Sequence, residues 1–341
     1  MINAIYRVVS PKLLEIAYEE IDLKGNHVIV RPTYLSICKA DQRYYQGSRD
    51  PEILAKKLPM ALIHEGIGKV VYDGSGSFEP GDTVVIVPNT PVESDEVIGE
   101  NYLSSSKFRS SGFDGFLQDY VISTPDRLVK INGNINYCVA SFSELISVCL
   151  HSINRLNKFS HSRKNSIGVW GDGNVGFITA VLLKFIFPGT KIIVFGKNPE
   201  KLSYFTFADE ICSINDVPDD LRIDHAFECV GGQSSQSAID QIIDHINPEG
   251  TISLLGVSEY PVPINTRMVL EKGLRLYGSS RSAKEDFENT IGILEKYPEI
   301  VNYLESIIAS VCPIRTINDI SHAFEKDNQL NFGKTVLIWD K

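Results

Sequence analysis

A glycine-rich turn near the middle of the chain constrains the fold more than any other feature. Gly171-Asp-Gly173-Asn-Val-Gly176 follows the apolar run IGVW (167–170) and precedes the helical pattern VGFITAVLLKFIF (175–187). In such a strand–turn–helix the first glycine permits a tight turn, the second lets a pyrophosphate approach the backbone, and the third lets helix and strand pack closely. The helix N-terminus then favours an anion. We therefore expect a dinucleotide site, against the alternative of a purely structural turn. Its residues are Gly171, Gly173, Asn174, Val175 and Gly176.

The end of the next predicted strand indicates which dinucleotide binds. KIIVF (191–195) is followed by Gly196-Lys197-Asn198, with Lys201 shortly after. Folds that bind NAD usually place a carboxylate here to hold the ribose 2′-hydroxyl. This chain has none, and the two lysines favour a 2′-phosphate. We expect NADPH to bind with Gly196, Lys197 and Lys201, although solvated surface lysines are the alternative.

The pattern along the chain predicts two domains. After the glycine-rich turn, the strand-like segments 225–230, 251–257 and 274–280 alternate with helical stretches, which predicts a doubly wound parallel sheet. Residues 1–145 are β-rich, with strands expected at 28–37, 66–72 and 83–87, and Pro32 suggests an edge or a bulge. The expected α/β fold has the domains 1–145 with 283–341, and 146–282; the pattern alone allows the return of 283–341 to the first domain but does not show it.

Composition excludes several classes of protein. Asp and Glu outnumber Lys and Arg by 43 to 33, so a formal charge of −10 disfavours binding to nucleic acid or to an anionic membrane. No apolar run approaches the roughly 18–20 residues that span a bilayer. The charged N-terminal segment does not resemble a signal peptide. Six scattered cysteines fit a reducing cytoplasm, where a functional cysteine serves as metal ligand or nucleophile.

Four side chains have the chemistry of a catalytic zinc site. Such a site takes about three ligands of the Cys, His or carboxylate type and leaves one position open. Cys38, His64, Glu65 and Glu144 fit this description. They lie far apart in the sequence, so spacing alone leaves open that the cysteine and the histidine belong to the core.

With these segments and the glycine-rich turn, the chain resembles the zinc-dependent medium-chain dehydrogenase/reductase family, which includes alcohol and sorbitol dehydrogenases. The resemblance implies a GroES-like catalytic domain and a Rossmann domain. It also implies that Cys38 and His64 bind zinc, that Glu65 and Glu144 share the remaining positions, and that Asp41 hydrogen-bonds His64. The other markers are Gly66, Gly68, Gly81-Asp82, Gly112-Phe-Asp-Gly115 and the Leu-Ile-Ser-Val that follows Glu144.

Two positions depart from the family pattern. Many members hold a second, structural zinc with four cysteines, but the corresponding segment from Asn89 to Gly112 contains no cysteine, so we expect one zinc per subunit. Ala40 stands where many members carry a Ser or Thr that relays a proton. The proton must therefore come from elsewhere, such as the Tyr44 hydroxyl or a water held by Glu65 or Glu144.

A narrower resemblance is to the bacterial ribulose-5-phosphate reductases of this family. It implies NADPH-dependent reduction of D-ribulose 5-phosphate to D-ribitol 5-phosphate for teichoic acid or capsule synthesis, beside a cytidylyltransferase partner. The resemblance to the wider family, in which dimers commonly join along the edge strand of the Rossmann sheet, implies a homodimer joined near 251–280. Tyr44, Arg281 and Arg109 are the candidates for substrate binding. The segments that carry this narrower resemblance include Asp41-Gln-Arg-Tyr-Tyr45, Leu58–Gly66, Trp170–Asn174, Ala226–Gly232 and Gly278–Ser282.

Two alternatives remain open at this point. The first is an NAD-dependent polyol or polyol-phosphate dehydrogenase of the sorbitol dehydrogenase type, which cofactor preference would separate from the reductase. The second is a non-catalytic scaffold that binds a cytidylyltransferase. A scaffold has no need to keep Cys38, His64, Glu65 and Glu144 together.

Overall fold

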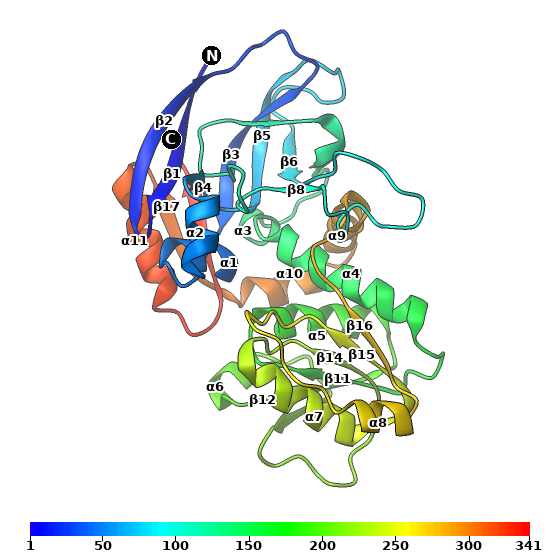
Figure 1. The fold of residues 1–341 in the computed structure, drawn as a ribbon. Helices are drawn as coiled ribbons and strands as arrows, with labels where there is room; N and C mark the ends of the chain where they lie inside the picture. Colours follow the sequence, from blue (N-terminus) through cyan, green and yellow to red (C-terminus); the bar gives the residue numbers. More distant parts are fainter. The chain divides into compact units, whose positions relative to one another are not determined.

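The structure is a computed structural model that describes residues 1–341 and divides into two compact units (Figure 1). The first unit comprises Met1–Ser147 and Arg281–Lys341, and the second comprises Val148–Ser280. Each has its own sheets and its own core, and the two are described separately. None of the helices combines the length and the apolar character that crossing a membrane requires.

The first unit is built on a seven-stranded, mostly antiparallel sheet with the order β10-β6-β5-β3-β18-β17, in which β9 also pairs with β3. A smaller sheet, β2-β1-β4, and a short β7–β8 pair complete its strands. Their bounds are β1 Ile2–Ser10, β2 Leu13–Glu20, β3 Val28–Ser36, β4 Met60–Ala61, β5 Glu65–Asp73, β6 Thr83–Ile86, β7 Asn89–Thr90, β8 Lys107–Phe108, β9 Val121–Ser123, β10 Leu128–Lys130, β17 Ile308–Ile314 and β18 Lys334–Trp339.

The C-terminal segment returns to this sheet. β18 pairs antiparallel with β3, with Val336 opposite Ser36, and parallel with β17. β3 is therefore an internal strand, and the irregularity predicted at Pro32 is a register shift between Pro32 and Tyr34. A proline is tolerated there because its missing N–H falls at a break in the ladder.

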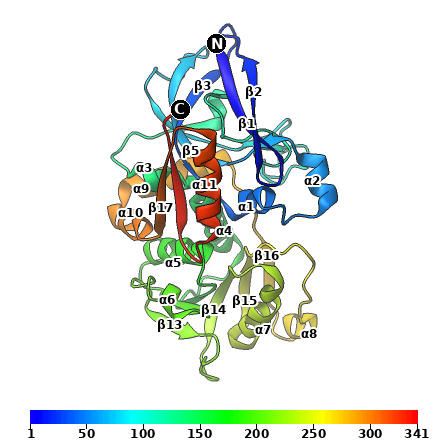
Figure 2. The ribbon, with the colours of Figure 1, turned by 90° about the vertical axis from the view of Figure 1, so that its left-hand side faces the viewer.

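Helices cover the first unit's sheets. α11 packs on β17 and β18, as Figure 2 shows, and the ring of its Phe324 stacks on Tyr45 of α1 at 4.5 Å. The apolar faces of α1 and α11 form one core cluster with those of the sheets. The bounds are α1 Lys39–Tyr45, α2 Pro51–Lys57, α3 Tyr137–Ala140, α4 Ser143–Phe159 (whose first turn belongs to this unit), α9 Lys284–Lys296, α10 Pro298–Glu305 and α11 Ile317–Asn328.

The second unit confirms the doubly wound prediction. Its six strands are all parallel, in the order β13-β12-β11-β14-β15-β16. The predicted helix after the glycine-rich turn is α5 (Asn174–Ile186), and its apolar residues from Phe177 to Leu183 are buried. The other elements are β11 Ser166–Trp170, β12 Lys191–Gly196, α6 Pro199–Leu202, β13 Glu210–Ser213, β14 Ile223–Glu228, α7 Ser235–His245, β15 Ile246–Leu254, α8 Thr266–Glu271 and β16 Arg275–Gly278.

Candidate metal centre and dinucleotide site

Three potential metal ligands meet in the first unit. Each of Cys38, His64 and Glu65 offers one donor atom, and these atoms all lie within 4.8 Å of one another. Strand register explains the meeting, because Ser36 at the end of β3 pairs with Glu65 at the start of β5. Cys38 lies two residues beyond that pair and therefore comes next to the histidine and the glutamate. The sulfur, nitrogen and oxygen donors form the kind of set that zinc binds.

The Asp41 carboxylate lies beside the His64 ring. Asp41 Oδ1 lies 3.3 Å from His64 Nδ1, and it also accepts hydrogen bonds from the Ser110 hydroxyl at 2.5 Å and from Ile63 N at 3.1 Å. Burial opposes the charge on Asp41, but His64 and these donors lower its pKa overall. Burial also opposes a charge on His64, but Asp41 and Cys38 raise its pKa well above the usual value. Asp41 thus faces Nδ1 of the ring, which has no other polar partner, and Nε2 is the nitrogen left for a metal.

The backbone just before His64 is strained. Ile63 has φ +71°, a left-handed conformation that β-branched residues rarely adopt. Two hydrogen bonds hold it there, from Ile63 N to Asp41 and from Phe116 N to the Ile63 carbonyl at 2.7 Å. Gly115 leaves room for this carbonyl, because a Cβ on Gly115 would lie 2.2 Å from it. The surrounding structure therefore enforces the direction of His64.

Lys334 is a site residue that sequence reasoning missed. Its Nζ lies 2.7 Å from Glu65 Oε2 and donates to the Ile37 carbonyl at 2.9 Å. Burial opposes the charge on Lys334, but Glu65 and Cys38 raise its pKa overall. Neither oxygen of the buried Glu65 carboxylate has a hydrogen-bond partner, and Oε1 also lacks the ion pair that Oε2 makes with Lys334. An unpartnered buried carboxylate oxygen is costly, and a bound cation would satisfy it, so the residues present fit a metal ion.

Glu144 lies beside this group rather than within it. It belongs to the first turn of α4, and its Oε2 is 4.0 Å from His64 Nε2. Burial raises the pKa of Glu144 to about 7. Burial likewise raises the pKa of the Cys38 thiol, against the influence of His64. A bound cation would act in the opposite direction, because metal binding stabilises the deprotonated ligands.

Of the three substrate-binding candidates, Arg281 is linked to the metal donors through the ring of Phe108. Its guanidinium is 4.8 Å from the centre of the Phe108 ring, and that ring is 5.5 Å from the ring of His64. Tyr44 is buried, with the Arg49 guanidinium 4.6 Å from its ring centre. Arg109 donates to the backbone carbonyls of Asp114 and Ile122, so its guanidinium supports a loop.

The glycine-rich turn of the second unit borders a pocket of about 460 Å³. Gly171 adopts φ +131°, and a Cβ on Gly176 would lie 1.9 Å from the Gly171 carbonyl oxygen. The third glycine is therefore required by packing, whereas a Cβ on Gly173 would meet no atom within 4 Å. Asn174 and Val175 begin α5 and are not among the lining residues. The predicted residues that line the pocket are Gly171, Gly173, Gly196, Lys197 and Lys201.

One carboxylate in this pocket was not counted at the sequence level. Asp172, inside the glycine-rich turn, accepts hydrogen bonds from Lys197 N at 2.8 Å and Asn198 N at 2.7 Å. It ties the turn to the end of β12 and satisfies the two backbone donors there. The side chains of Lys197 and Lys201 remain the cations of the pocket.

Comparison with known proteins agrees with this geometry. The alcohol dehydrogenase GroES-like domain matches residues 24–133, and the zinc-binding dehydrogenase domain matches residues 175–296. Together with the parallel sheet and the Cys38–His64–Glu65 group, these matches define the class. The chain belongs to the zinc-dependent medium-chain dehydrogenase/reductase family.

Within this family, the chain is similar over its whole length to ribulose-5-phosphate reductases. It is 56% identical over 340 residues to that of Bacillus spizizenii, covering 100% of both chains. It is 55% identical to ribulose-5-phosphate reductase 1 of Staphylococcus aureus, covering 99% of both. The crystal structure of S. aureus TarJ in complex with NADPH superposes with a TM-score of 0.90 at 49% identity, covering 100% of both chains.

Proposed function

We propose that this chain reduces D-ribulose 5-phosphate to D-ribitol 5-phosphate with NADPH. The observation that carries the proposal is the buried Cys38–His64–Glu65 group in a chain 55–56% identical, over its full length, to ribulose-5-phosphate reductases. The NADPH complex of the similar TarJ structure supports the choice of cofactor. In the reaction, a hydride moves from nicotinamide C4 to C2 of the ketose and one proton is added to the oxygen. NADPH becomes NADP⁺ and the ketone becomes a secondary alcohol.

One zinc ion per subunit is part of the proposal. Cys38, His64 and Glu65 Oε1 would hold it, with Glu144 as a further oxygen donor beside His64. Bound zinc would act as a Lewis acid that polarises the substrate carbonyl. The protein keeps its ligands ready for that role, because Asp41 orients the imidazole and Lys334 balances the charge of Glu65. The segment from Asn89 to Gly112 has no cysteine to hold a second zinc.

The second unit would bind the dinucleotide. The pyrophosphate fits the start of α5 at the glycine-rich turn, where Gly173 leaves open space for its approach. Lys197 and Lys201 would bind the 2′-phosphate that distinguishes NADPH from NADH. Gly196 allows the turn to pack against the end of β12, because a Cβ there would lie 2.8 Å from Asp172 Cβ.

Arg281 would bind the phosphate of the substrate. Guanidinium groups pair well with phosphate, and this one lies over Phe108 next to the His64 ring. Burial lowers the pKa of Arg281 and thereby marks a site where the charge is partly desolvated. The Tyr44 hydroxyl is a second candidate contact. Arg109 is assigned to supporting its loop instead of binding substrate, because it donates to two carbonyls.

The setting of the enzyme is also a proposal. We assign the chain to the cytoplasm, because none of its six cysteines forms a disulfide. A homodimer would form along β16, the last strand of its sheet, whose outer edge has no strand partner. The product would feed teichoic acid or capsule synthesis through a cytidylyltransferase partner, as the resemblance of the sequence implies.

A steady-state assay tests the proposal. The purified protein is given D-ribulose 5-phosphate with NADPH or NADH, with and without a chelator. We expect turnover with NADPH that is lost with the metal, and loss of both zinc and turnover in Cys38→Ser. Cys312→Ser, in β17 of the same unit, is the matched control and should retain both. Near-normal turnover by a zinc-free variant would refute the Lewis-acid role, and oxidation of polyols with NAD alone would favour the sorbitol dehydrogenase type.

A further inference from the structure

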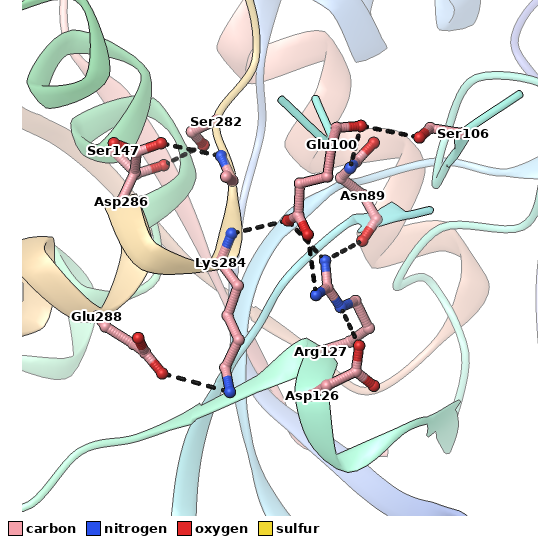
Figure 3. A network of polar contacts seen from close by, with 11 residues as sticks. Asn89, Glu100, Ser106, Asp126, Arg127, Ser147, Ser282, Lys284, Asp286 and Glu288 are labelled. Atoms are coloured by element: carbon pink, nitrogen blue, oxygen red, sulfur yellow. Dashed lines mark hydrogen bonds and ion pairs between the residues drawn. The ribbon is translucent and has the colours of Figure 1, made fainter. Parts of the chain in front are cut away.

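The segment between β7 and β8 is held by Glu100 rather than by regular structure. β7 and β8 are only two residues each, so most of residues 89–108 has no ladder to fix it. The Glu100 carbonyl accepts hydrogen bonds from Asn89 Nδ2 at 3.2 Å and from Ser106 Oγ at 2.8 Å (Figure 3). These two residues lie near opposite ends of the segment, so Glu100 closes it at its base.

The Glu100 carboxylate binds a buried arginine with both oxygens. Arg127 Nη1 lies 2.8 Å from Oε1 and Arg127 Nη2 lies 3.2 Å from Oε2. Arg127 also donates to the Asn89 carbonyl at 3.3 Å and to Asp126 at 2.9 Å. A bidentate guanidinium–carboxylate pair is directional and strong, and burial of the guanidinium increases its dependence on this partner.

The same carboxylate also binds the backbone shortly after Arg281. Glu100 Oε1 accepts from Lys284 N at 2.9 Å, and Lys284 is the first residue of α9 (Figure 3). The preceding turn is fixed by Ser282 Oγ, 2.6 Å from Ser147 Oγ, and by Ala283 N, which donates to Asp286 at 2.9 Å. Arg281 itself has φ +57°, a conformation that needs such support.

Glu100 therefore contacts both supports of the Arg281–Phe108 stack. On one side, Asn89 pairs with Phe108 across β7 and β8, and Glu100 holds Asn89. On the other side, Glu100 binds the backbone three residues after Arg281. We propose that Glu100 is a positioning residue that fixes the Arg281 guanidinium over Phe108 and so sets the affinity for the phosphate end of the substrate. This inference rests on the proposed role of Arg281 in binding that phosphate.

The test measures KM and kcat separately in the Glu100→Ala variant. We expect the KM for D-ribulose 5-phosphate to rise about tenfold, as for a weakened charge-assisted contact. The KM for NADPH, the bound zinc and kcat should change less than about twofold. Glu100→Gln should recover much of the substrate KM, because its amide oxygen still accepts the Lys284 N–H, and it guards against a folding defect in the alanine variant.

Glu295→Ala is the matched control. The Glu295 carboxylate also holds a loop of the same unit, accepting from Asn132 N at 2.9 Å and Gly133 N at 2.7 Å, but it has no contact with the Arg281 turn. A merely structural role for Glu100 predicts that both alanine variants lose stability alike and keep the substrate KM. That result would overturn the proposal.

A double variant separates this inference from the proposed function. In an Arg281→Ala background, Glu100→Ala should raise the substrate KM no further, because the group that it positions is gone. If the two substitutions raised the substrate KM independently, so that their factors multiplied in the double variant, the positioning role would be overturned. If Arg281→Ala alone leaves the substrate KM unchanged, the assignment of Arg281 fails and the positioning role fails with it. If Arg281→Ala raises the KM and Glu100→Ala does not, only the positioning role fails.

Discussion

Lys334 Nζ lies 2.7 Å from Glu65 Oε2, and the two side chains are 2% and 0% exposed. Lys334 begins β18 and Glu65 begins β5, and both strands flank β3, whose end leads to Cys38. The last strand of the chain thus brings a counter-charge to the metal donors. It occupies one oxygen of Glu65 and leaves the other, Oε1, without a hydrogen bond.

Removing Lys334 should destabilise the first unit. Lys334→Met leaves the Glu65 carboxylate buried without its cation, so we expect a loss of about 3–5 kcal/mol in the free energy of unfolding. Urea denaturation measures this loss. The double variant with Glu65→Gln should recover part of it, since no unpaired charge then remains. A loss below about 1 kcal/mol, the value typical of an exposed pair, would contradict the prediction.

Lys197→Ala should weaken the binding of NADPH and leave the binding of NADH unchanged. If the lysine binds the 2′-phosphate, the KM for NADPH rises about tenfold, as expected for loss of one charge-assisted contact, and the KM for NADH stays the same. Initial rates at varied cofactor concentration give both values. Lys191→Ala serves as the control. Lys191 is the first residue of β12 and pairs with Glu210. An unchanged NADPH KM would remove Lys197 from the site.

Alanine substitutions at two glycines of the turn should impair NADPH binding for different reasons. Gly176→Ala places a Cβ 1.9 Å from the Gly171 carbonyl oxygen, so we expect lower thermal stability together with loss of NADPH binding. Gly173→Ala meets no protein atom within 4 Å, so the fold should persist while the methyl group obstructs the pyrophosphate. Thermal denaturation and NADPH fluorescence titration distinguish the two. Wild-type NADPH affinity in Gly173→Ala would show that the ligand does not approach this backbone.

His225 should make the stability of the second unit depend on pH. Burial and the neighbouring His161 lower its pKa from 6.5 to about 4, while its ring contacts the Arg163 carbonyl and accepts from Thr251 N. Above about pH 6.5 the ring is neutral in the folded and unfolded chains. As the pH falls toward 4 the unfolded chain binds the proton first, so up to about 3 kcal/mol of stability is lost.

Urea denaturation between pH 7 and pH 4.5, followed by the fluorescence of Trp170 in a Trp339→Phe background, checks this slope. His225→Gln offers a donor and an acceptor but no titrating group, so its stability should vary less over the same range. Equal slopes for the two proteins would assign the pH dependence to other groups.

The sequence predicted the second unit more completely than the first, and the reason is the range of the interactions. The strand–turn–helix signature lies within adjacent residues, and the alternation of β11, α5 and β12 repeats over short distances. β17 and the return of β18 to β3 depend on pairing between distant segments. No local pattern encodes such pairing, so the sequence indicated only that the C-terminal segment could return.

The metal donors and Asp41 beside His64 were predicted from the resemblance to the family, but the other supporting residues were not. Lys334 reads as an ordinary strand-start lysine until the β18–β3 pairing brings it to Glu65. Glu100 lies in a segment that the sequence distinguished only by its lack of cysteine. Asp172 lies in the turn and not at the end of β12, where a ribose-binding carboxylate is expected, yet its carboxylate reaches the backbone at that end.

The way in which Glu100 holds its segment has a practical consequence for metal chemistry. The segment is fixed by an arginine and by backbone donors, which chelators leave intact. Stripping the ion from Cys38, His64 and Glu65 should therefore leave residues 89–108 folded. The apoprotein should then accept Co²⁺ in place of zinc without refolding, so that the visible spectrum of the cobalt ion becomes a direct probe of ligand exchange at this centre.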